Sequence, residues 1–497
     1  MPRVELSSEP LAASPAAMLA VAAYAGDGDD AAPVPAGGAA ALGEAVGIDL
    51  AAELATVGFQ AGPGEVVRIP TRGSIPAATV LVVGLGKADD VTTDRLRRAA
   101  AAVAGAAERV ATIATDLPSA LPDGATEDTV GAVVEGLALG SYRFGRYRTE
   151  APGHHLETAT LHVADADDLR AAADRAVVAA DAAVFARDLV NTPPQDKRPP
   201  ALAERMVETF AGTDVQVRVL DEQALEEGGY GGILGVGQGS SEPPRLVELT
   251  YAPEGATRHV ALVGKGITFD TGGISLKPSE SMETMKLDMA GAATVAAVVR
   301  AAAEMQLPVR ITGLLALAEN MPSGTATRVS DVLTMKGGQT VEVINTDAEG
   351  RLVLGDALVH ASEAQPDAIV DIATLTGAAV VALGEKIGVL MASDDDLAGA
   401  ILDASSRTGE VLWRLPLASE QYGDRLEGSI SDLRNAGSRS AGTIFAGLFL
   451  HKFVGDGIPW AHLDIAGVAW TAEADGYHAK GATGVPVRTL LRWLQTA

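Results

Sequence analysis

The chain has 497 residues, of which 47% are hydrophobic and 21% are charged, so we expect two or more folded domains rather than a disordered chain. Its 38 basic and 65 acidic residues give a formal net charge of −27, which argues against binding nucleic acid or anionic membranes non-specifically. The sequence contains no cysteine, which excludes thiol nucleophiles, cysteine-based zinc sites and disulfides and fits a reducing cytoplasm.

The amino terminus contains an apolar stretch from Ala12 to Ala25 that ends like a signal-peptide cleavage site. However, Glu5 and Glu9 precede it and Pro15 interrupts it, whereas a signal peptide needs a positively charged start and an uninterrupted apolar core. We therefore expect a buried strand here. No uncharged stretch reaches the ~18 apolar residues that a membrane span requires, so no membrane insertion is predicted.

Residues 1–165 are predicted to form an amino-terminal α/β domain, because short apolar runs alternate with Ala-rich helical patterns. The expected strands are 66–69, 79–83 and 159–163, and the expected helices are 94–107 and 126–140. Gly84-Leu-Gly-Lys87 lacks the upstream glycine of a phosphate-binding loop, so we interpret it as a strand-to-helix turn. The polar stretch 151–155 is expected as a loop.

A long helix is predicted to connect this domain to the next, at residues 166–190. The sequence Asp167–Val190 contains neither Gly nor Pro, and Asn191-Thr-Pro-Pro194 follows, where a helix should end. Residues 191–497 are predicted to form a second domain with a mostly parallel sheet between helix layers. Its expected strands are 216–220, 245–250, 259–263, 310–317 and 367–372. The predicted fold class is thus α/β, with two domains that each contain a mostly parallel or mixed sheet flanked by helices.

Three segments of the second domain carry candidate functional residues. In the first, Val263-Gly-Lys-Gly-Ile-Thr-Phe-Asp-Thr-Gly-Gly-Ile-Ser-Leu-Lys277, an apolar run that is typical of a buried strand ends in glycine-rich turns. Lys265 and Asp270 are expected near the end of that strand, and Lys277 follows the Gly272-Gly273 bend. In the second, Met285-Lys-Leu-Asp-Met-Ala-Gly291, Asp288 precedes a helical pattern at 292–303. A capping role for Asp288 is at least as well supported as a catalytic one.

The third segment is the octapeptide Asn345-Thr-Asp-Ala-Glu-Gly-Arg-Leu352. If it is extended, Asp347, Glu349 and Arg351 share one face, because side chains two positions apart point the same way along a strand. Two adjacent carboxylates repel each other, and a divalent cation would offset that repulsion. An acidic turn in solvent is the alternative interpretation of the octapeptide alone.

Together the segments contain four carboxylates, which two divalent cations would neutralise. Carboxylate oxygens suit Mg²⁺, Mn²⁺ and Zn²⁺, and ions about 3.5–4 Å apart form the two-metal arrangement of many hydrolases. Lys265 could be a ligand only as a neutral amine, which requires its pKa to fall. Lys277 and Arg351 remain as cations for a developing oxyanion or a bound anion.

Other catalytic and nucleotide-binding motifs are absent from the sequence. The eight histidines form no His-Glu-x-x-His pattern, and there is no Gly-x-Ser-x-Gly nucleophile motif. Gly235-Val-Gly-Gln-Gly239 narrowly misses a dinucleotide-binding fingerprint, because Ser240 stands where its last glycine would be. We interpret this segment as a flexible loop.

The three segments, in this order, resemble the leucyl aminopeptidase family of two-metal peptidases. Further blocks carry the resemblance over most of the chain: Glu135–Phe144, Arg187–Pro194, Ser431–Gly437 and Trp460–Gly467. The resemblance implies a metal-dependent aminopeptidase of the cytoplasm that releases Leu and other apolar amino-terminal residues from short peptides. It also implies two divalent ions per subunit, Mn²⁺ or Zn²⁺, and a homohexameric assembly.

Carried over residue by residue, the resemblance also implies roles within the site. Lys265, Asp270, Asp288 and Glu349 would hold one metal, and Asp270, Asp347 and Glu349 would hold the other. Lys277 and Arg351 would be catalytic, with a bicarbonate bound at Arg351. The wall of the pocket for the cleaved residue would consist of Met285, Thr374, Gly377, Ala466 and Ala469. A binding or regulatory assembly protein without peptide turnover is the alternative function.

Overall fold

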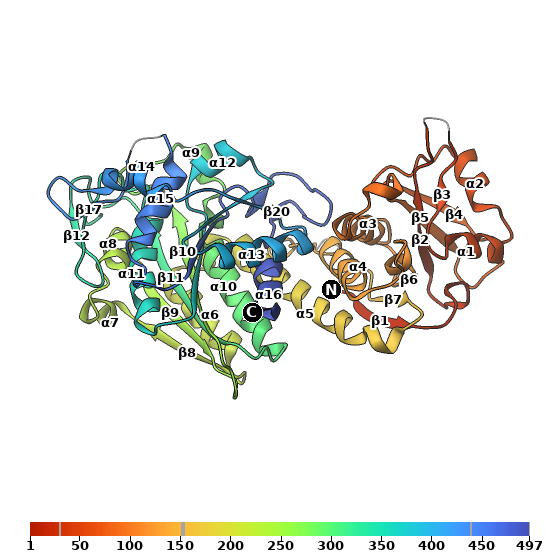
Figure 1. The fold of residues 1–497 in the computed structure, drawn as a ribbon, viewed down its shortest axis with the longest axis horizontal. Helices are drawn as coiled ribbons and strands as arrows, with labels where there is room; N and C mark the ends of the chain where they lie inside the picture. Colours follow the sequence, from red (N-terminus) through yellow and green to blue (C-terminus); the bar gives the residue numbers. More distant parts are fainter. Residues whose placement is uncertain (29–30, 151–154, 438–439, 497) are drawn as a thin grey trace. The chain divides into compact units, whose positions relative to one another are not determined.

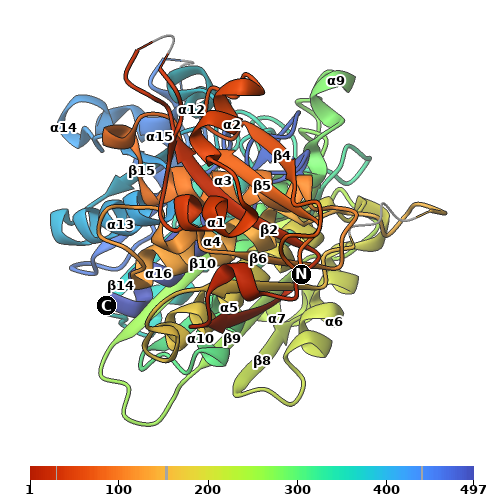
Figure 2. The same ribbon diagram turned by 90° about the vertical axis from the view of Figure 1, so that its right-hand side faces the viewer.

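The computed structural model describes residues 1–28, 31–150, 155–437 and 440–496, which divide into two compact units (Figures 1 and 2). The first unit comprises Met1–Val184 together with Arg407–Gly409 and Ala472–Lys480. The second unit comprises Phe185–Ser406, Glu410–Thr471 and Gly481–Ala497.

The first unit contains a seven-stranded sheet in the order β1-β7-β6-β2-β5-β4, with β3 paired to β2. Its elements are β1 (Arg3–Ser7), β2 (Met18–Tyr24), β3 (Val34–Pro35), α1 (Ala39–Val46), α2 (Leu50–Thr56), β4 (Val66–Pro70), β5 (Thr79–Gly84), α3 (Thr93–Ala106), β6 (Thr112–Thr115), α4 (Glu127–Gly140), β7 (Thr158–His162) and most of α5 (Ala166–Asn191). Strands β1, β7, β6, β2 and β5 run parallel, whereas β3 and β4 are antiparallel to their neighbours.

Helices cover both faces of this sheet because successive strand residues point to opposite sides. In β2, Ala20 and Ala22 pack in the core that contains α3 and α4, whereas Leu19 and Val21 pack in the core that contains α1 and α2. The strands and helices predicted in this region are confirmed. The buried strand expected within 12–25 is confirmed as β2, and most of the predicted loop at 151–155 lies outside the described residues.

Helix α5 has 26 residues and covers the predicted connecting helix. The division between the two units falls inside it, after Val184. The later segment Ala472–Lys480 belongs to the first unit: Asp475 accepts a hydrogen bond from Arg98 Nη1 at 3.0 Å, and the Tyr477 hydroxyl donates to Asp94 Oδ1 at 3.0 Å.

The second unit is built on an eight-stranded mixed sheet in the order β16-β15-β18-β14-β10-β11-β9-β8. Its elements are α6 (Pro199–Phe210), β8 (Val215–Leu220), α7 (Glu222–Glu227), α8 (Gly231–Gly237), β9 (Arg245–Tyr251), β10 (His259–Asp270), α9 (Ser279–Met282), η5 (Met285–Met289), α10 (Ala290–Glu304), β11 (Arg310–Asn320), β12 (Val332–Thr334), β13 (Thr340–Glu342), α11 (Gly350–Glu363), β14 (Ala368–Ala373), α12 (Gly377–Leu383), β15 (Gly388–Ala392), α13 (Asp395–Thr408), β16 (Leu412–Arg414), α14 (Ser419–Tyr422), β17 (Leu433–Arg434), α15 (Gly442–His451), β18 (Trp460–Asp464), β19 (Trp470–Thr471), β20 (Gly481–Ala482) and α16 (Val487–Thr496).

The centre of this sheet is parallel, since β10 pairs in parallel with β11 and β14, and β14 pairs in parallel with β18. Helices α8, α11 and α15 pack in the large core on one face, and α10 packs against β10, β11 and α16 (Figure 1). The α/β fold class and the predicted strands are confirmed. Phe445, Leu448 and Phe449 of α15 are buried in this core.

The prediction of a flexible loop at Gly235–Gly239 was wrong, because α8 runs from Gly231 to Gly237. A Cβ atom at Gly235 would lie 2.7 Å from the Leu333 side chain. The glycines therefore serve close packing of a short helix, which the motif comparison did not reveal.

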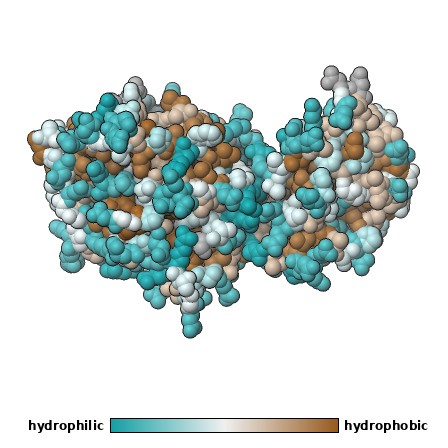
Figure 3. Space-filling model, in the orientation of Figure 1, coloured by the Kyte–Doolittle hydropathy of each residue, from teal (hydrophilic) through white to brown (hydrophobic). Residues whose placement is uncertain are grey.

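Among the helices in the described part of the chain, none is long and apolar enough to cross a membrane. Figure 3 shows hydrophilic residues interspersed with hydrophobic ones over the face that it presents.

Candidate metal centre

The candidate residues gather where the parallel central strands end. Asp270 is the last residue of β10 and pairs in register with Asn320, the last residue of β11, after a register shift that follows Ile267. Strands β14 and β18 end at the same edge. Thr374 directly follows β14, and Asp464 is the last residue of β18. Ligands of open α/β sheets bind at this edge.

One half of the centre is built around Lys265 and is closed to solvent. Lys265 Nζ lies 2.8 Å from Asp288 Oδ1 and 2.9 Å from Glu349 Oε1, and all three side chains are at most 4% exposed. The ammonium also donates to the Thr374 carbonyl at 3.0 Å. Burial alone would lower the pKa of Lys265, but the carboxylates around it raise that pKa above its ordinary value. A divalent cation would have to neutralise these carboxylates before the neutral amine expected from the sequence could form.

Asp288 does not cap the helix that follows it. Asp288 lies in η5, one residue before Met289, the N-cap residue of α10. No side chain makes a capping hydrogen bond at this helix start. Its Oδ1 instead accepts hydrogen bonds from Lys265 and, at 2.7 Å, from the Thr374 hydroxyl. The capping role allowed by the sequence was therefore wrong, because the side chain points into the centre.

A glycine keeps this closed half compact. A Cβ atom at Gly350 would lie 2.5 Å from Lys265 Cε, so any side chain there would displace the lysine. Because Gly350 has no side chain, the first turn of α11 can lie against Lys265. The carboxylate of Glu349, directly before Gly350, then pairs with the same lysine.

The other half of the centre is built around Lys277 and is more open. Lys277 Nζ lies 2.9 Å from Asp270 Oδ2 and also contacts Asp347 Oδ1. The side chain of Lys277 is 15% exposed and that of Asp347 is 32% exposed. Neighbouring carboxylates raise the pKa of Lys277 against the opposing effect of its burial, so its ammonium stays charged.

A tight loop brings Lys277 back towards Asp270. Gly272 and Gly273 have φ angles of +84° and +64°, a region that favours glycine, and the Lys277 N–H donates to the Thr271 carbonyl at 2.9 Å. The Gly272 N–H in turn donates to Asp270 Oδ1 at 2.8 Å, which leaves Oδ2 to face the lysine.

The octapeptide is not extended, so the condition under which Asp347, Glu349 and Arg351 would share a strand face is not met. Thr346 and Asp347 form a turn, and α11 begins at Gly350. Asp347 and Glu349 nevertheless reach one site because the turn and the helix start direct both carboxylates inwards. The apolar run that follows lies in α11, whose buried residues include Val353, Leu354 and Leu358.

These residues fit divalent cations. Asp270, Asp347 and Glu349 each offer one carboxylate oxygen, and the three oxygens lie within 4.8 Å of one another. Asp288 Oδ2 and Glu349 Oε2 are buried and make no hydrogen bond within the structure described. Counted formally, four carboxylates against two ammonium groups leave two negative charges in a site whose closed half is buried, which favours a bound cation.

Arg351 lies on the first turn of α11, beside Glu349. Its Nη1 donates to the Asn435 carbonyl at 2.8 Å, whereas its buried Nε has no hydrogen-bond partner among the described residues. Burial lowers the pKa of Arg351 to about 10, against the raising influence of Glu349 and Asp464, so it is charged at neutral pH. The free Nε–H is suited to an anion.

The five pocket residues expected from the resemblance differ in exposure. Met285 and Ala466 are half-buried, and Gly377 is exposed at the start of α12. Thr374 and Ala469 are buried. The Thr374 hydroxyl is occupied by its bond to Asp288, so this side chain also orients a carboxylate of the centre.

Sequence reasoning missed Asn320. Its Nδ2 donates to Asp270 Oδ1 at 2.8 Å and to the Thr346 carbonyl at 3.1 Å, so it joins β10 to the octapeptide. The signal was its place three residues beyond the predicted strand 310–317, but strand order was needed to use it.

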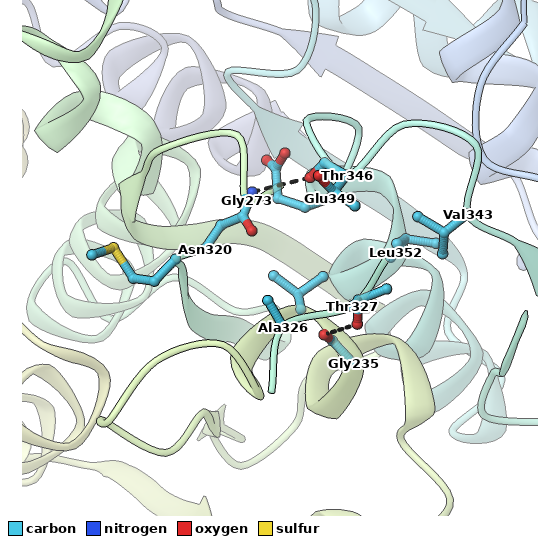
Figure 4. Close-up of a pocket in the computed structure, with 11 residues that line it drawn as sticks. Gly235, Gly273, Asn320, Ala326, Thr327, Val343, Thr346, Glu349 and Leu352 are labelled. Atoms are coloured by element: carbon cyan, nitrogen blue, oxygen red, sulfur yellow. Dashed lines mark hydrogen bonds between the residues drawn. The ribbon is translucent and has the colours of Figure 1, made fainter. Parts of the chain in front are cut away.

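A small cavity of ≈ 10 Å³, about the size of one water molecule, adjoins Glu349. Figure 4 shows Asn320, Thr346, Thr327 and Gly235 around it, with the Thr327 hydroxyl bonded to the Gly235 carbonyl. The cavity is too small to hold a peptide.

Comparisons with known proteins agree with this site. Residues 184–491 match the catalytic domain of the cytosol aminopeptidase family, and residues 20–151 match the amino-terminal domain of that family. A probable cytosol aminopeptidase of Streptomyces avermitilis is 48% identical over 477 residues, which are 92% of this chain and 91% of that protein.

Two solved structures are similar over almost the whole chain. The bottromycin maturation enzyme BotP in complex with Mn is 41% identical, with a TM-score of 0.85, over 97% of this chain and 99% of that one. A mutant of tomato leucine aminopeptidase is 30% identical, with a TM-score of 0.88, over 100% of this chain and 97% of that one.

Fold, site and comparisons together define a hydrolase of the peptidase class, with a two-unit α/β architecture. Because family models match both units and relatives are nearly half identical over almost the full length, the chain belongs to the cytosol aminopeptidase family.

Proposed function

We propose that the protein is a metal-dependent aminopeptidase that releases amino-terminal residues, with Leu and other apolar residues preferred, from short peptides. The observation that carries the proposal is the cluster of four carboxylates and two lysines, one half buried and the other more open, at the end of the central strands. Family membership supports the reaction, and the carboxylate oxygens support the need for divalent cations.

In this proposal, Lys265, Asp270, Asp288 and Glu349 hold one divalent ion, and Asp270, Asp347 and Glu349 hold the other. Mn²⁺ and Zn²⁺ are the candidates, and the Mn complex of BotP supports the first. When bound, the pair of ions would acidify a water molecule and polarise the scissile carbonyl. Asn320 and Thr374 orient Asp270 and Asp288 through the hydrogen bonds described above.

Lys277 is proposed as a catalytic residue of the open half. Its ammonium is charged and partly exposed, so it can donate a hydrogen bond to the oxygen that becomes negative as water adds to the peptide carbonyl. Its two carboxylate partners fix the ammonium position before substrate arrives.

Arg351 is proposed as the second catalytic residue, with bicarbonate as its anion. Its unpartnered Nε–H and its permanent charge support anion binding. A bicarbonate held there could accept the proton of the attacking water and pass it on.

The proposed pocket for the cleaved side chain consists of Met285, Thr374, Gly377, Ala466 and Ala469. Its two alanines and its glycine leave room for an apolar side chain, and Met285 can adapt to its shape. Because Ala469 is buried, it would bound the pocket from behind.

A homohexamer and a cytoplasmic location are also proposed, mainly by family resemblance. An enclosed assembly would restrict substrates to short or unfolded peptides. The non-catalytic alternative is not favoured, because all seven metal and catalytic positions are present.

The test is hydrolysis of leucine-p-nitroanilide by the purified protein, with and without added Mn²⁺, alongside metal analysis and a dipeptide panel. Release of the amine that depends on metal supports the proposal. Metal-loaded protein that binds peptides without cleaving them would instead support the non-catalytic alternative.

A further inference from the structure

Lys197 is a buried lysine outside the centre, and its burial, with Lys286 and Arg205 nearby, lowers its pKa. It is 1% exposed and follows the Pro194–Asp196 turn after α5. Its Nζ donates three hydrogen bonds to carbonyl oxygens, to Leu189 at 3.1 Å, Val190 at 2.8 Å and Lys286 at 2.7 Å. An ammonium group has three donors, so each is used.

Two of these carbonyls belong to the last turn of α5. The last carbonyls of a helix have no partner within the helix and carry partial negative charge, so a buried lysine satisfies them well. A second lysine contacts the same helix end, since Lys286 Nζ donates to the Asn191 carbonyl at 3.1 Å.

The third carbonyl, that of Lys286, belongs to η5. This turn carries Met285 of the proposed substrate pocket and Asp288 of the metal centre. Lys197 thus joins the rigid end of α5 to the short turn from which two functional side chains project, and Lys286 makes a second connection between the same two elements.

We propose that Lys197 is a positioning residue, whose ammonium fixes the Met285–Met289 turn against the end of α5 and thereby sets the places of Met285 and Asp288. The inference rests on the proposed function, because it assigns those two residues to substrate and metal. A side chain that merely filled space would not need three convergent hydrogen bonds, and a neutral side chain could not supply them.

The first test compares Lys197→Met with Arg488→Met. The control removes another buried cation of the second unit, whose Nε pairs with Glu410 at 3.3 Å, outside the centre. Both variants should lose thermal stability. Only Lys197→Met should weaken Mn²⁺ affinity, by ~10–100-fold as for other residues that orient metal ligands, and raise KM for leucine-p-nitroanilide.

The second test is chemical rescue. Lys197→Ala leaves the three carbonyl oxygens around a space that propylammonium matches in length and charge. Added propylammonium should restore part of the Mn²⁺ affinity and lower KM, whereas 1-propanol, of similar shape but without charge, should not.

Unchanged Mn²⁺ affinity and KM in Lys197→Met, with stability lost as in the control, would show that Lys197 only stabilises the fold. If Lys197→Met does not fold, Lys197→Arg replaces it, and a folded protein with shifted KM supports the proposal. Failure of both to fold beside a folded control overturns it. Wild-type protein without peptidase activity would refute the proposed function itself, whereas metal affinities would still test the positioning role.

Discussion

The two halves of the centre use the same chemistry at different depths. Lys265 binds two carboxylates in a region closed to water, whereas Lys277 binds two carboxylates at an opening where Asp347 is one-third exposed. In the closed half, removing one partner of an ion pair leaves the other charged group buried without solvent. In the open half, water can take the place of the missing partner. The closed lysine is therefore suited to holding structure and metal, and the open lysine to acting on substrate.

The largest expected effect is that of removing metal from both halves at once. Chelation should abolish peptidase activity, and Mn²⁺ or Zn²⁺ should restore it, because the four carboxylates would otherwise face only two ammonium groups. The measurement is leucine-p-nitroanilide turnover with metal content followed in parallel. Full turnover by protein shown to lack metal would contradict the two-metal proposal.

Glu349→Gln should break the link between the halves, because Glu349 lies against Lys265 and within reach of Asp270 and Asp347. We expect kcat/KM to fall by more than ~100-fold, the upper end for residues that only orient a ligand, together with metal content. Kinetics and metal analysis on the same sample check this.

Lys277→Ala is the counterpart in the open half. Metal should remain bound while kcat falls by ~100–1,000-fold, as when an oxyanion-stabilising donor is removed. Equal loss of metal in Glu349→Gln and Lys277→Ala would show that Lys277 is structural and that the halves do not differ in role.

The stability difference between the halves can be measured with a matched pair, Lys265→Met and Lys277→Met, after chelation. Lys265→Met leaves buried carboxylates unpaired and should lower the free energy of unfolding by about 3–5 kcal/mol. Lys277→Met should lower it by less, because solvent reaches Asp347. Urea denaturation of both variants gives the comparison, and equal losses would remove the distinction.

Asp116 in the first unit is a third buried carboxylate site, for which we expect a smaller effect on stability. Its carboxylate accepts a hydrogen bond from the backbone N–H of Gly38 at 2.8 Å. Burial raises its pKa to about 6 from an ordinary value of 3.8. The folded state therefore binds the proton more tightly than the unfolded state, and stability falls as pH rises from about 4 to 6, by at most about 3 kcal/mol. Asp116→Asn should flatten this dependence, as measured by hydrogen exchange of the β6 amides. A slope that persists in the variant would assign it to another group.

Local sequence patterns predicted the helices and strands better than the hydrogen bonds that join them at the site. Alternating apolar runs were sufficient for β10, β11 and α10, because burial determines each element along its own stretch. Asn320 and the side-chain bond between Thr374 and Asp288 depend on which strands become neighbours. The octapeptide 345–352 shows the same limit. Its turn is fixed by hydrogen bonds with Gly272 and Asn435, which are far away in sequence.

The return of Ala472–Lys480 to the first unit has a consequence for synthesis on the ribosome. The amino-terminal sheet is complete once β7 has emerged, yet the partners that Asp475 and Tyr477 provide to Arg98 and Asp94 arrive only near the end of translation. The first unit therefore lacks these two partners while almost the entire second unit is synthesised. A nascent chain arrested before residue 472 should accordingly be cleaved more readily by protease around α3 than the released full-length protein.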